Sequence, residues 1–212
     1  MGDLVENCGG NYPSQTFTVE LNRREQMKVA RRLIRDALIE WSKHVNKIVV
    51  SAVAGNHGEN RQNGKAFTGD GDNDDVALFE QLAETFSMNE NFDHISFVIP
   101  DDKLTVVLDI DGTLIGFNHG HKATRGPTAQ KKQELWWTDQ TFGGQPVGDA
   151  DILVTGHYHR FSIVDLGPKI HIQCPAMDGG SKWWQDVTGK QAKTGTVTFL
   201  IGKEGLTDIQ IV

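Results

Sequence analysis

The chain has 212 residues, of which 38% are hydrophobic and 23% are charged, a composition that suits a single folded domain spanning residues 1–212. The net charge of −7 excludes a uniformly basic nucleic-acid coat protein. No apolar run approaches the ~20 residues that span a bilayer, so we expect no membrane partner. Cys8 and Cys174 are too few for a disulfide framework, and no signal peptide precedes them, which favours a cytoplasmic protein.

The hydrophobic pattern predicts helices early in the chain and strands late. Residues 22–44 read as a helix with Val29, Leu33, Ala37 and Trp41 on its core side, and a second helix follows a polar cap over residues 75–86. Residues 123–142 look polar and irregular. Short apolar or alternating runs predict strands at 47–54, 95–100, 104–109, 113–118, 151–155, 161–166, 169–174, 195–201 and 206–212. This order favours an α/β fold.

Four short segments combine a small residue with side chains that bind metals. They are Gly2-Asp3-Leu4-Val5-Glu6-Asn7, Gly55-Asn56-His57, Asn118-His119-Gly120-His121 and Gly156-His157-Tyr158-His159. Glycine lets the chain turn sharply after a strand, and the ligand then projects from a rigid base. Aspartate, asparagine and neutral histidine are ligands of Zn, Mn, Fe and similar divalent ions. Together, and in this order, the segments predict a metal site.

These four motifs resemble those of the calcineurin-like metallophosphoesterase superfamily, and the resemblance runs over essentially the whole chain. Wider stretches, including Gly55-Asn56-His57-Gly58-Glu59-Asn60-Arg61 and Gly71-Asp72-Asn73-Asp74-Asp75, are similar to phage and actinobacterial members. The resemblance implies a four-layer αββα sandwich with a dinuclear centre of Mn, Zn or Fe. It also implies hydrolysis of a phosphate mono- or diester, with nucleic acid or a nucleotide as candidate substrate.

The resemblance also assigns roles to residues. It implies these metal ligands: Asp3, Asn56, His119, His157 and His159. His57 would lie over the phosphate as general acid or electrostatic stabiliser, tuned by a neighbouring carboxylate. Glu6 would lie behind the metal ligands rather than bind the metal. His121 would orient a ligand from behind it.

One departure from the family concerns its first motif. The family begins with Asp-x-His, or Asp-x-Gln in some phage-like members, whereas this chain starts at Met1-Gly2-Asp3, inside the second motif. We therefore expect an N-terminally incomplete sandwich in which one metal site keeps only Asp3 and His159. Weak activity or none follows, and a decayed, non-enzymatic metal-binding domain is the alternative.

A second alternative comes from Leu108-Asp109-Ile110-Asp111-Gly112-Thr113-Leu114, which matches the nucleophile motif of haloacid-dehalogenase-like phosphatases. There Asp109 would attack phosphorus. The motif lies far from the start of the chain, so a hairpin turn at Asp-Gly is the favoured interpretation.

The arginines between positions 23 and 35 form a basic helix face that makes nucleic acid a candidate partner, although such faces are more often simply solvated. The sequence does not predict an oligomeric state.

Overall fold

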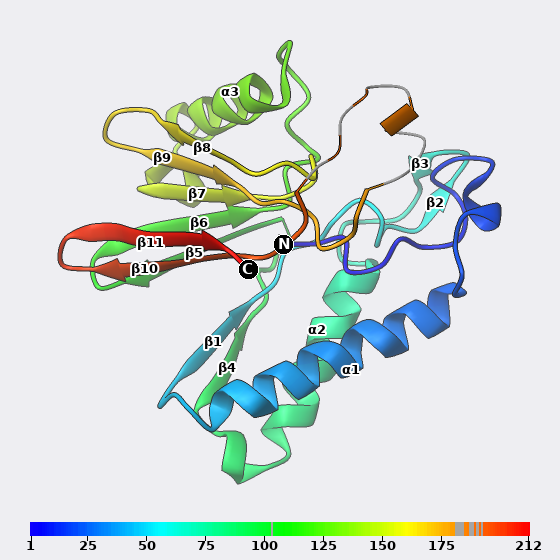
Figure 1. Cartoon of the computed structure of the whole chain (residues 1–212), viewed down its shortest axis with the longest axis horizontal. Coiled ribbons are helices and arrows are strands. Elements are labelled where there is room, and N and C mark those ends of the chain that lie inside the picture. The colour runs from blue at the N-terminus through cyan, green and yellow to red at the C-terminus, as the bar shows by residue number, and fades with distance from the viewer. Residues whose placement is uncertain (103, 181–184, 187–188, 190, 192) are drawn as a thin grey trace. The chain divides into compact units, whose positions relative to one another are not determined.

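The computed structural model describes residues 1–102, 104–180, 185–186, 189, 191 and 193–212 (Figure 1). These residues cluster into two compact units, 1–106 and 107–212, which we take in turn.

The first unit combines two long helices with short strands. After an N-terminal loop come the 3-10 turn η1 (Gln15–Phe17), α1 (Arg23–Ser42), β1 (Ile48–Ser51), β2 (Arg61–Gln62), β3 (Lys65–Ala66), α2 (Asp74–Ser87), η2 (Glu90–Phe92) and β4 (Ile95–Val98). β1 pairs in parallel with β4, and β2 pairs with β3 in a small antiparallel hairpin. Figure 1 shows α1 crossing in front of α2. Both main helices fall where the sequence predicts them.

Helix α1 begins at a reciprocal cap. The Asn22 side chain accepts from the Glu25 N–H at 3.0 Å, and the Asn22 N–H donates to the Glu25 carboxylate at 3.0 Å. The face that the sequence predicts to be buried is wrong, because Leu33 is 67% and Trp41 59% exposed. The buried face is offset by about one residue and centres on Leu38, which packs with α2 and β4.

The core of the first unit lies between the helices and the parallel strand pair. It consists of these buried side chains: Leu38, Ala52, Leu78, Phe79, Leu82, Phe86 and Ile95. Four of the seven come from α2, which is therefore the main support of this unit. The prediction of a strand buried on both faces at 47–54 is wrong in part, because Val49 in β1 is exposed.

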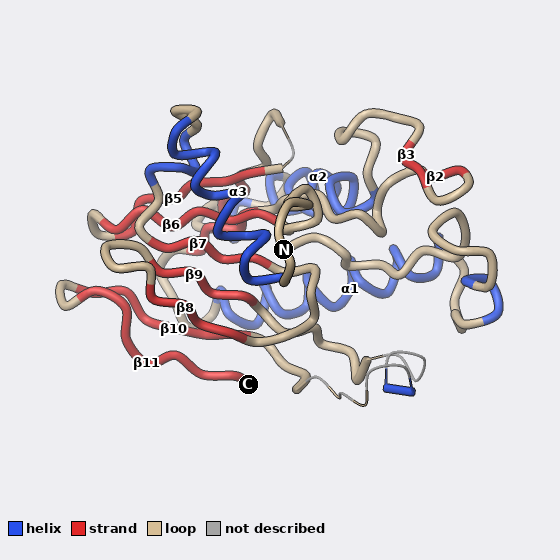
Figure 2. Tube along the Cα trace, turned by 90° about the horizontal axis from the view of Figure 1, so that it is seen from above, coloured by secondary structure: helices blue, strands red, loops and turns tan. Residues whose placement is uncertain are grey.

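The second unit is a sheet covered by one helix. Its elements are β5 (Thr105–Ile110, which begins at the boundary), β6 (Thr113–Asn118), α3 (Ala129–Phe142), η3 (Pro146–Asp149), β7 (Ile152–Thr155), β8 (Ser162–Asp165), β9 (Ile170–Gln173), β10 (Val197–Gly202) and β11 (Gly205–Ile211). The first five strands form one sheet in the order β5-β6-β7-β9-β8, and β10 and β11 form a separate antiparallel hairpin (Figure 2).

β5 and β6 are joined by a two-residue turn at Asp111 and Gly112. Both residues have positive φ, 52° and 85°, which is the geometry of a type I′ hairpin turn. The Asp109 carboxylate accepts the Gly112 N–H at 2.8 Å and so closes the turn. The hairpin interpretation of the Asp-x-Asp-Gly segment is confirmed, and the strand–loop–helix context that a dehalogenase nucleophile requires is not found there.

Helix α3 corrects the expectation of an irregular segment at 123–142. It is capped by Thr128, whose side chain accepts the Lys131 N–H at 3.1 Å. Trp137 lies on its buried face and packs with Val147, Ala150 and Leu153, so α3 covers one face of the sheet. Because β6 and β7 are parallel neighbours with α3 between them in sequence, their carboxyl ends meet at one edge.

The mixed α/β class predicted from the sequence is confirmed by these helices and sheets. Among the described residues, no helix is both long and apolar enough to cross a membrane.

Candidate functional site

In the first unit, the N-terminal loop is bound to one buried carboxylate. Asp75 Oδ2 accepts the Asp3 N–H at 2.8 Å and the Gly55 N–H at 2.9 Å, while Oδ1 accepts the Leu4 N–H at 2.9 Å. Asp75 is 1% exposed. Burial raises its pKa, the three N–H donors lower it, and the charge of Asp3 raises it further; the net pKa is above the usual range. A single side chain from α2 thus fixes the backbone of two predicted ligand segments.

The Asp3 carboxylate lies directly over the Gly55-Asn56-His57 segment. Its Oδ1 accepts the His57 N–H at 2.8 Å. A Cβ at Gly55 would lie 2.2 Å from that same oxygen, so only glycine fits there. The Asn73 side chain donates to the Gly55 carbonyl at 2.8 Å and holds the segment from the other side. The structure therefore brings Asp3 against the segment that carries Asn56 and His57.

His57 makes an ion pair with Glu6. Its Nδ1 lies 3.1 Å from Glu6 Oε2 and 3.1 Å from the Glu6 carbonyl oxygen. Burial lowers the pKa of His57, but the hydrogen bond to Glu6 and the charges of Asp3 and Glu6 outweigh it and raise the pKa to about 9. Burial raises the pKa of Glu6, and the His57 contact more than reverses this, so the pKa is lowered. Both partners are charged at neutral pH.

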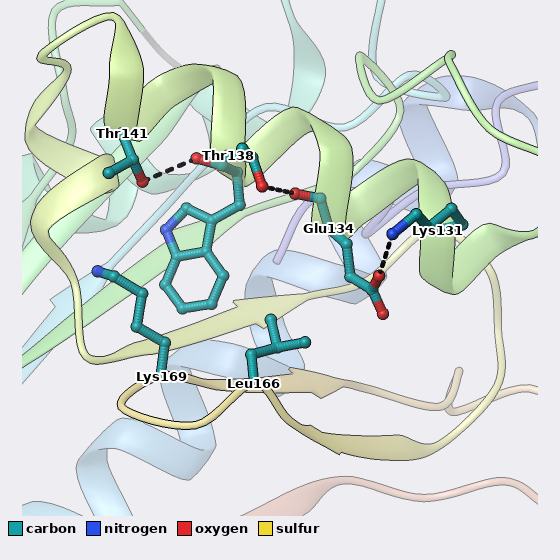
Figure 3. Close-up of a pocket in the computed structure, with 7 residues that line it drawn as sticks. Lys131, Glu134, Thr138, Thr141, Leu166 and Lys169 are labelled. Carbon is teal, nitrogen blue, oxygen red and sulfur yellow. Dashed lines mark hydrogen bonds and ion pairs between the residues drawn. The ribbon is translucent and has the colours of Figure 1, made fainter.

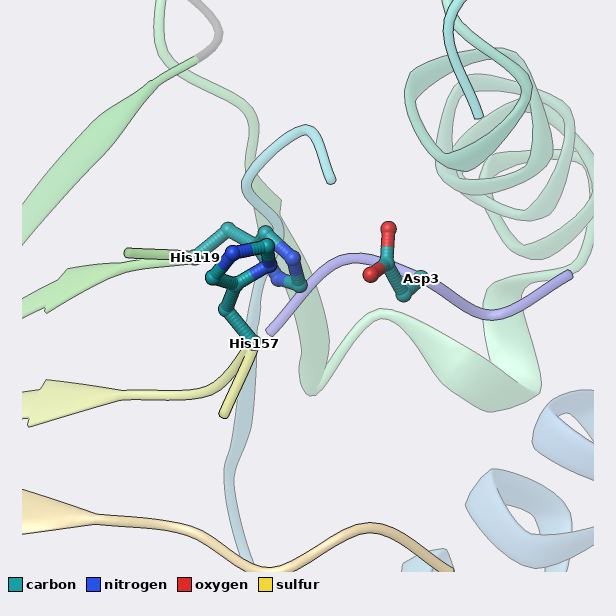
Figure 4. Close-up of side chains that lie close together, drawn as sticks. All are labelled: Asp3, His119 and His157. Carbon is teal, nitrogen blue, oxygen red and sulfur yellow. The ribbon is translucent and has the colours of Figure 1, made fainter. Parts of the chain in front are cut away.

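In the second unit, three histidines gather where β6 and β7 end. His119 and His121 follow β6, and His157 follows β7. Figure 4 shows the side chains of His119 and His157 next to each other. The ring centroids of His119 and His157 are 5.1 Å apart, and those of His119 and His121 are 5.3 Å apart. His119 is 2% exposed, whereas His121 and His157 are half-buried. The two loops are joined by the Gly156 N–H, which donates to the His119 carbonyl at 3.0 Å.

The backbone is strained at two of these positions. His157 has φ 68° and His159 φ 50°, both in the left-handed region. The other non-glycine residues with positive φ in the described part of the chain are Asp and Asn, which together with His are the types found most often in this region. Such strain clusters at functional sites, where the surrounding structure maintains it. Asp3, with φ 52°, shares the conformation.

The side chains of the Asp3 loop in the first unit and of the histidine loops in the second unit are of types that bind divalent metal ions. Neutral imidazole nitrogens and a carboxylate are the ligand set of Zn, Mn and Fe. Two imidazole rings from adjacent strand ends, one of them fully buried, match the rigid base that a metal site needs. His159 follows in the same loop and is exposed.

Three further residues at the site could not be predicted from the sequence, because their side chains support the ligand loops through contacts distant in sequence. Asp75 reads as a helix-cap residue, yet its side chain binds the loop around Asp3. Gln133 and Gln173 read as ordinary polar residues of a helix and a strand, yet both are buried and donate to the histidine loops. No pattern in the sequence marks these contacts.

A pocket of about 330 Å³ lies elsewhere in the second unit, between α3 and the β8–β9 turn (Figure 3). The Lys169 ammonium donates to the Gly148 and Ala150 carbonyls at 2.9 and 2.6 Å and lies 5.0 Å from the Trp137 ring centroid. Lys131 pairs with Glu134 at 3.0 Å. Lys169 thus links the β8–β9 turn to η3 and α3, and Lys131 and Glu134 pair with each other along α3.

The basic face of α1 is partly engaged within the first unit. Arg23 pairs with Asp74 at 2.6 Å, and Arg35 pairs with Asp36 at 2.6 Å. Contact with nucleic acid stays a prediction.

No protein-family model matches the chain, and no curated protein matches it either. Among solved structures, it is similar to Vps29 from Entamoeba histolytica in complex with zinc, at 15% identity over 76% of this chain and 88% of that one, with a TM-score of 0.39. A predicted phosphoesterase from Streptococcus pneumoniae gives 12% identity over 80% and 74%, with a TM-score of 0.38. Vps29 from Chaetomium thermophilum gives 10% identity over 83% and 84%, with a TM-score of 0.39. Likeness at this level does not establish a family, an activity or a ligand for this chain.

Proposed function

We propose that this protein binds divalent metal ions and hydrolyses phosphate esters with them. The observation that carries the proposal is the gathering of His119, His121 and His157 at the ends of two adjacent parallel strands. The left-handed backbone at His157 and His159 supports it, because a hydrogen-bonded surface loop has no need of such strain. The proposed ligands are Asp3, Asn56, His119, His157 and His159.

The chain's own residues would do the following. The imidazoles of the second unit hold the ion, while the carboxylate of Asp3, fixed by Asp75 and by the His57 N–H, supplies negative charge. His57, paired with Glu6, is the candidate group for stabilising the phosphate or protonating the leaving oxygen. A bound divalent cation would supply Lewis-acid polarisation of the phosphate and activate water for attack.

The test combines metal binding with hydrolysis. Metal content after dialysis against Mn²⁺ or Zn²⁺ gives the stoichiometry, and bis-p-nitrophenyl phosphate and p-nitrophenyl phosphate distinguish diester from monoester hydrolysis. His157→Ala should lose metal, whereas His44→Ala should not, since His44 is an exposed histidine that follows α1 and pairs with Glu40.

The outcomes are distinct. Metal-dependent hydrolysis that His157→Ala abolishes supports the proposal in full. Binding without hydrolysis refutes the enzyme and leaves a metal-binding domain. Hydrolysis that survives in His157→Ala but is lost in Asp109→Asn would favour the dehalogenase mechanism instead.

A further inference from the structure

Two buried glutamines contact the two histidine loops of the second unit in the same way. Gln133 Nε2 donates to the Gly120 carbonyl at 2.9 Å, inside His119-Gly120-His121. Gln173 Nε2 donates to the Arg160 carbonyl at 2.6 Å, directly after His159. One comes from α3 and the other from β9, so the two loops are held by separate elements.

The glutamines lie on the same side of the sheet, under α3. Leu153 packs against Trp137 of α3, so Thr155, two residues later on β7, also faces α3. Gln173 is the register neighbour of Thr155 on β9 and shares that face. Gln133 lies one helical turn before Trp137 and therefore faces the sheet. Both amides thus sit in one layer at the carboxyl end of the strands.

Stability alone does not account for these side chains. Gln133 is 0% and Gln173 2% exposed, and in the described part of the chain neither Oε1 has a hydrogen-bond partner. A buried amide that is only half satisfied costs roughly 1–3 kcal/mol, which an apolar side chain of the same size would avoid. Buried polar atoms without a hydrogen-bond partner, which a packed core normally avoids, are expected at functional sites.

The backbone of the histidine loops needs such support. Gly120 has φ 108°, and a Cβ there would lie 2.7 Å from Gln133 Nε2, so the amide is fitted against the bare glycine. His157 and His159 hold left-handed backbones that cost of order 1–3 kcal/mol each. A hydrogen bond to the carbonyl that follows His159 helps to maintain this conformation.

We infer that Gln133 and Gln173 are positioning residues that set the geometry of the metal-binding histidines through the backbone of their loops. The inference rests on the proposed metal site and adds residues that determine its affinity. Substituting partners that orient metal ligands typically weakens metal binding about 10–100-fold.

The test uses Gln133→Met and Gln173→Met, which keep the side-chain length and remove the donor. Gln145→Met is the matched control, since Gln145 is exposed and its side chain donates to the Gly143 carbonyl at 3.4 Å. Calorimetry gives the Kd for Zn²⁺, and the visible spectrum of the Co²⁺ form reports the ligand geometry. Hydrogen exchange of the metal-free protein reports the order of residues 119–121 and 157–160.

Each buried variant should raise the Kd about tenfold, change the Co²⁺ spectrum and speed exchange in its own loop. The Tm without metal should change little, because removal of the unpaired Oε1 offsets the loss of the hydrogen bond to the loop carbonyl. The control should match the wild type. A lower Tm with wild-type Kd and spectrum would show that the glutamines only stabilise the fold, and would overturn the inference. If the wild type itself binds no metal, the proposed function fails first, and the positioning role fails with it.

Discussion

Replacing Asp75 with asparagine tests how the first unit fixes its N-terminal loop. The carboxylate accepts three backbone N–H groups, from Asp3, Leu4 and Gly55. The single oxygen of an asparagine amide can still accept the N–H groups of Asp3 and Gly55, which Oδ2 accepts in the native protein. Its NH₂ group then faces the N–H of Leu4, which needs an acceptor. That buried donor loses its partner, at a cost of about 2 kcal/mol. The two remaining bonds also lose their charge assistance, but the neutral amide avoids the burial cost that raises the pKa of Asp75. These two effects offset each other, so Asp75→Asn should destabilise the protein by about 2 kcal/mol.

The assay is urea denaturation together with hydrogen exchange at Leu4 and Gly55. Asp72→Asn is the matched control, because Asp72 is exposed and its carboxylate accepts from the Asn60 side chain. Its cost should stay within about 0.5 kcal/mol. If Asp75→Asn unfolds at the same urea concentration as Asp72→Asn and exchange at Leu4 and Gly55 is unchanged, the buried carboxylate does not hold the loop.

Three further predictions concern titration and packing. Burial lowers the pKa of His171 to about 4 against the attraction of Glu134, so the unfolded chain takes up the proton first as pH falls. Up to about 3 kcal/mol of stability should disappear between pH 6.5 and 4, and denaturation of His171→Leu should lack this slope. The pKa of His57 is raised to about 9, so its contribution to the stability of the fold is complete below about pH 6.5 and is lost as pH rises through 9. Glu6→Gln should lower the His57 pKa in an NMR titration, and an unchanged pKa would contradict the ion pair. Leu38→Ala should cost about 3 kcal/mol and Leu33→Ala under about 0.5 kcal/mol in the same denaturation assay, and equal costs would contradict the observed burial of α1.

The strands of the second unit are largely predictable, because their signals are local. Runs of alternating or β-branched residues mark where the strands lie. The Asp111-Gly112 pair between two of these runs indicates the type of turn that joins them. The predicted strand at 113–118 agrees with β6 at both ends.

The two helix errors have different physical causes. α3 was missed because its apolar residues do not repeat every three or four positions, and it contacts the sheet through Trp137 and the polar Gln133. In α1, Val29-Leu33-Ala37-Trp41 and Ala30-Ile34-Leu38 are two stripes of equal spacing. Only packing against α2 and β4 selects the second, and that choice is not encoded locally.

The candidate ligands could be found from sequence because glycine-histidine and glycine-aspartate motifs are contiguous. Their supports could not be found, since Asp75 reaches Asp3 across 72 positions of sequence and Gln133 reaches Gly120 across 13. The sequence therefore shows the reactive side chains, and the fold shows what holds them.

The two ends of the sheet offer different opportunities for labelling. The Asp111-Gly112 turn precedes β6 and the turn around Gly167 precedes β9, so both lie at the end away from His119. β6 has six residues, which separates its two ends by about 20 Å. A spin label or fluorophore attached at either turn would therefore report on the second unit without disturbing its histidines.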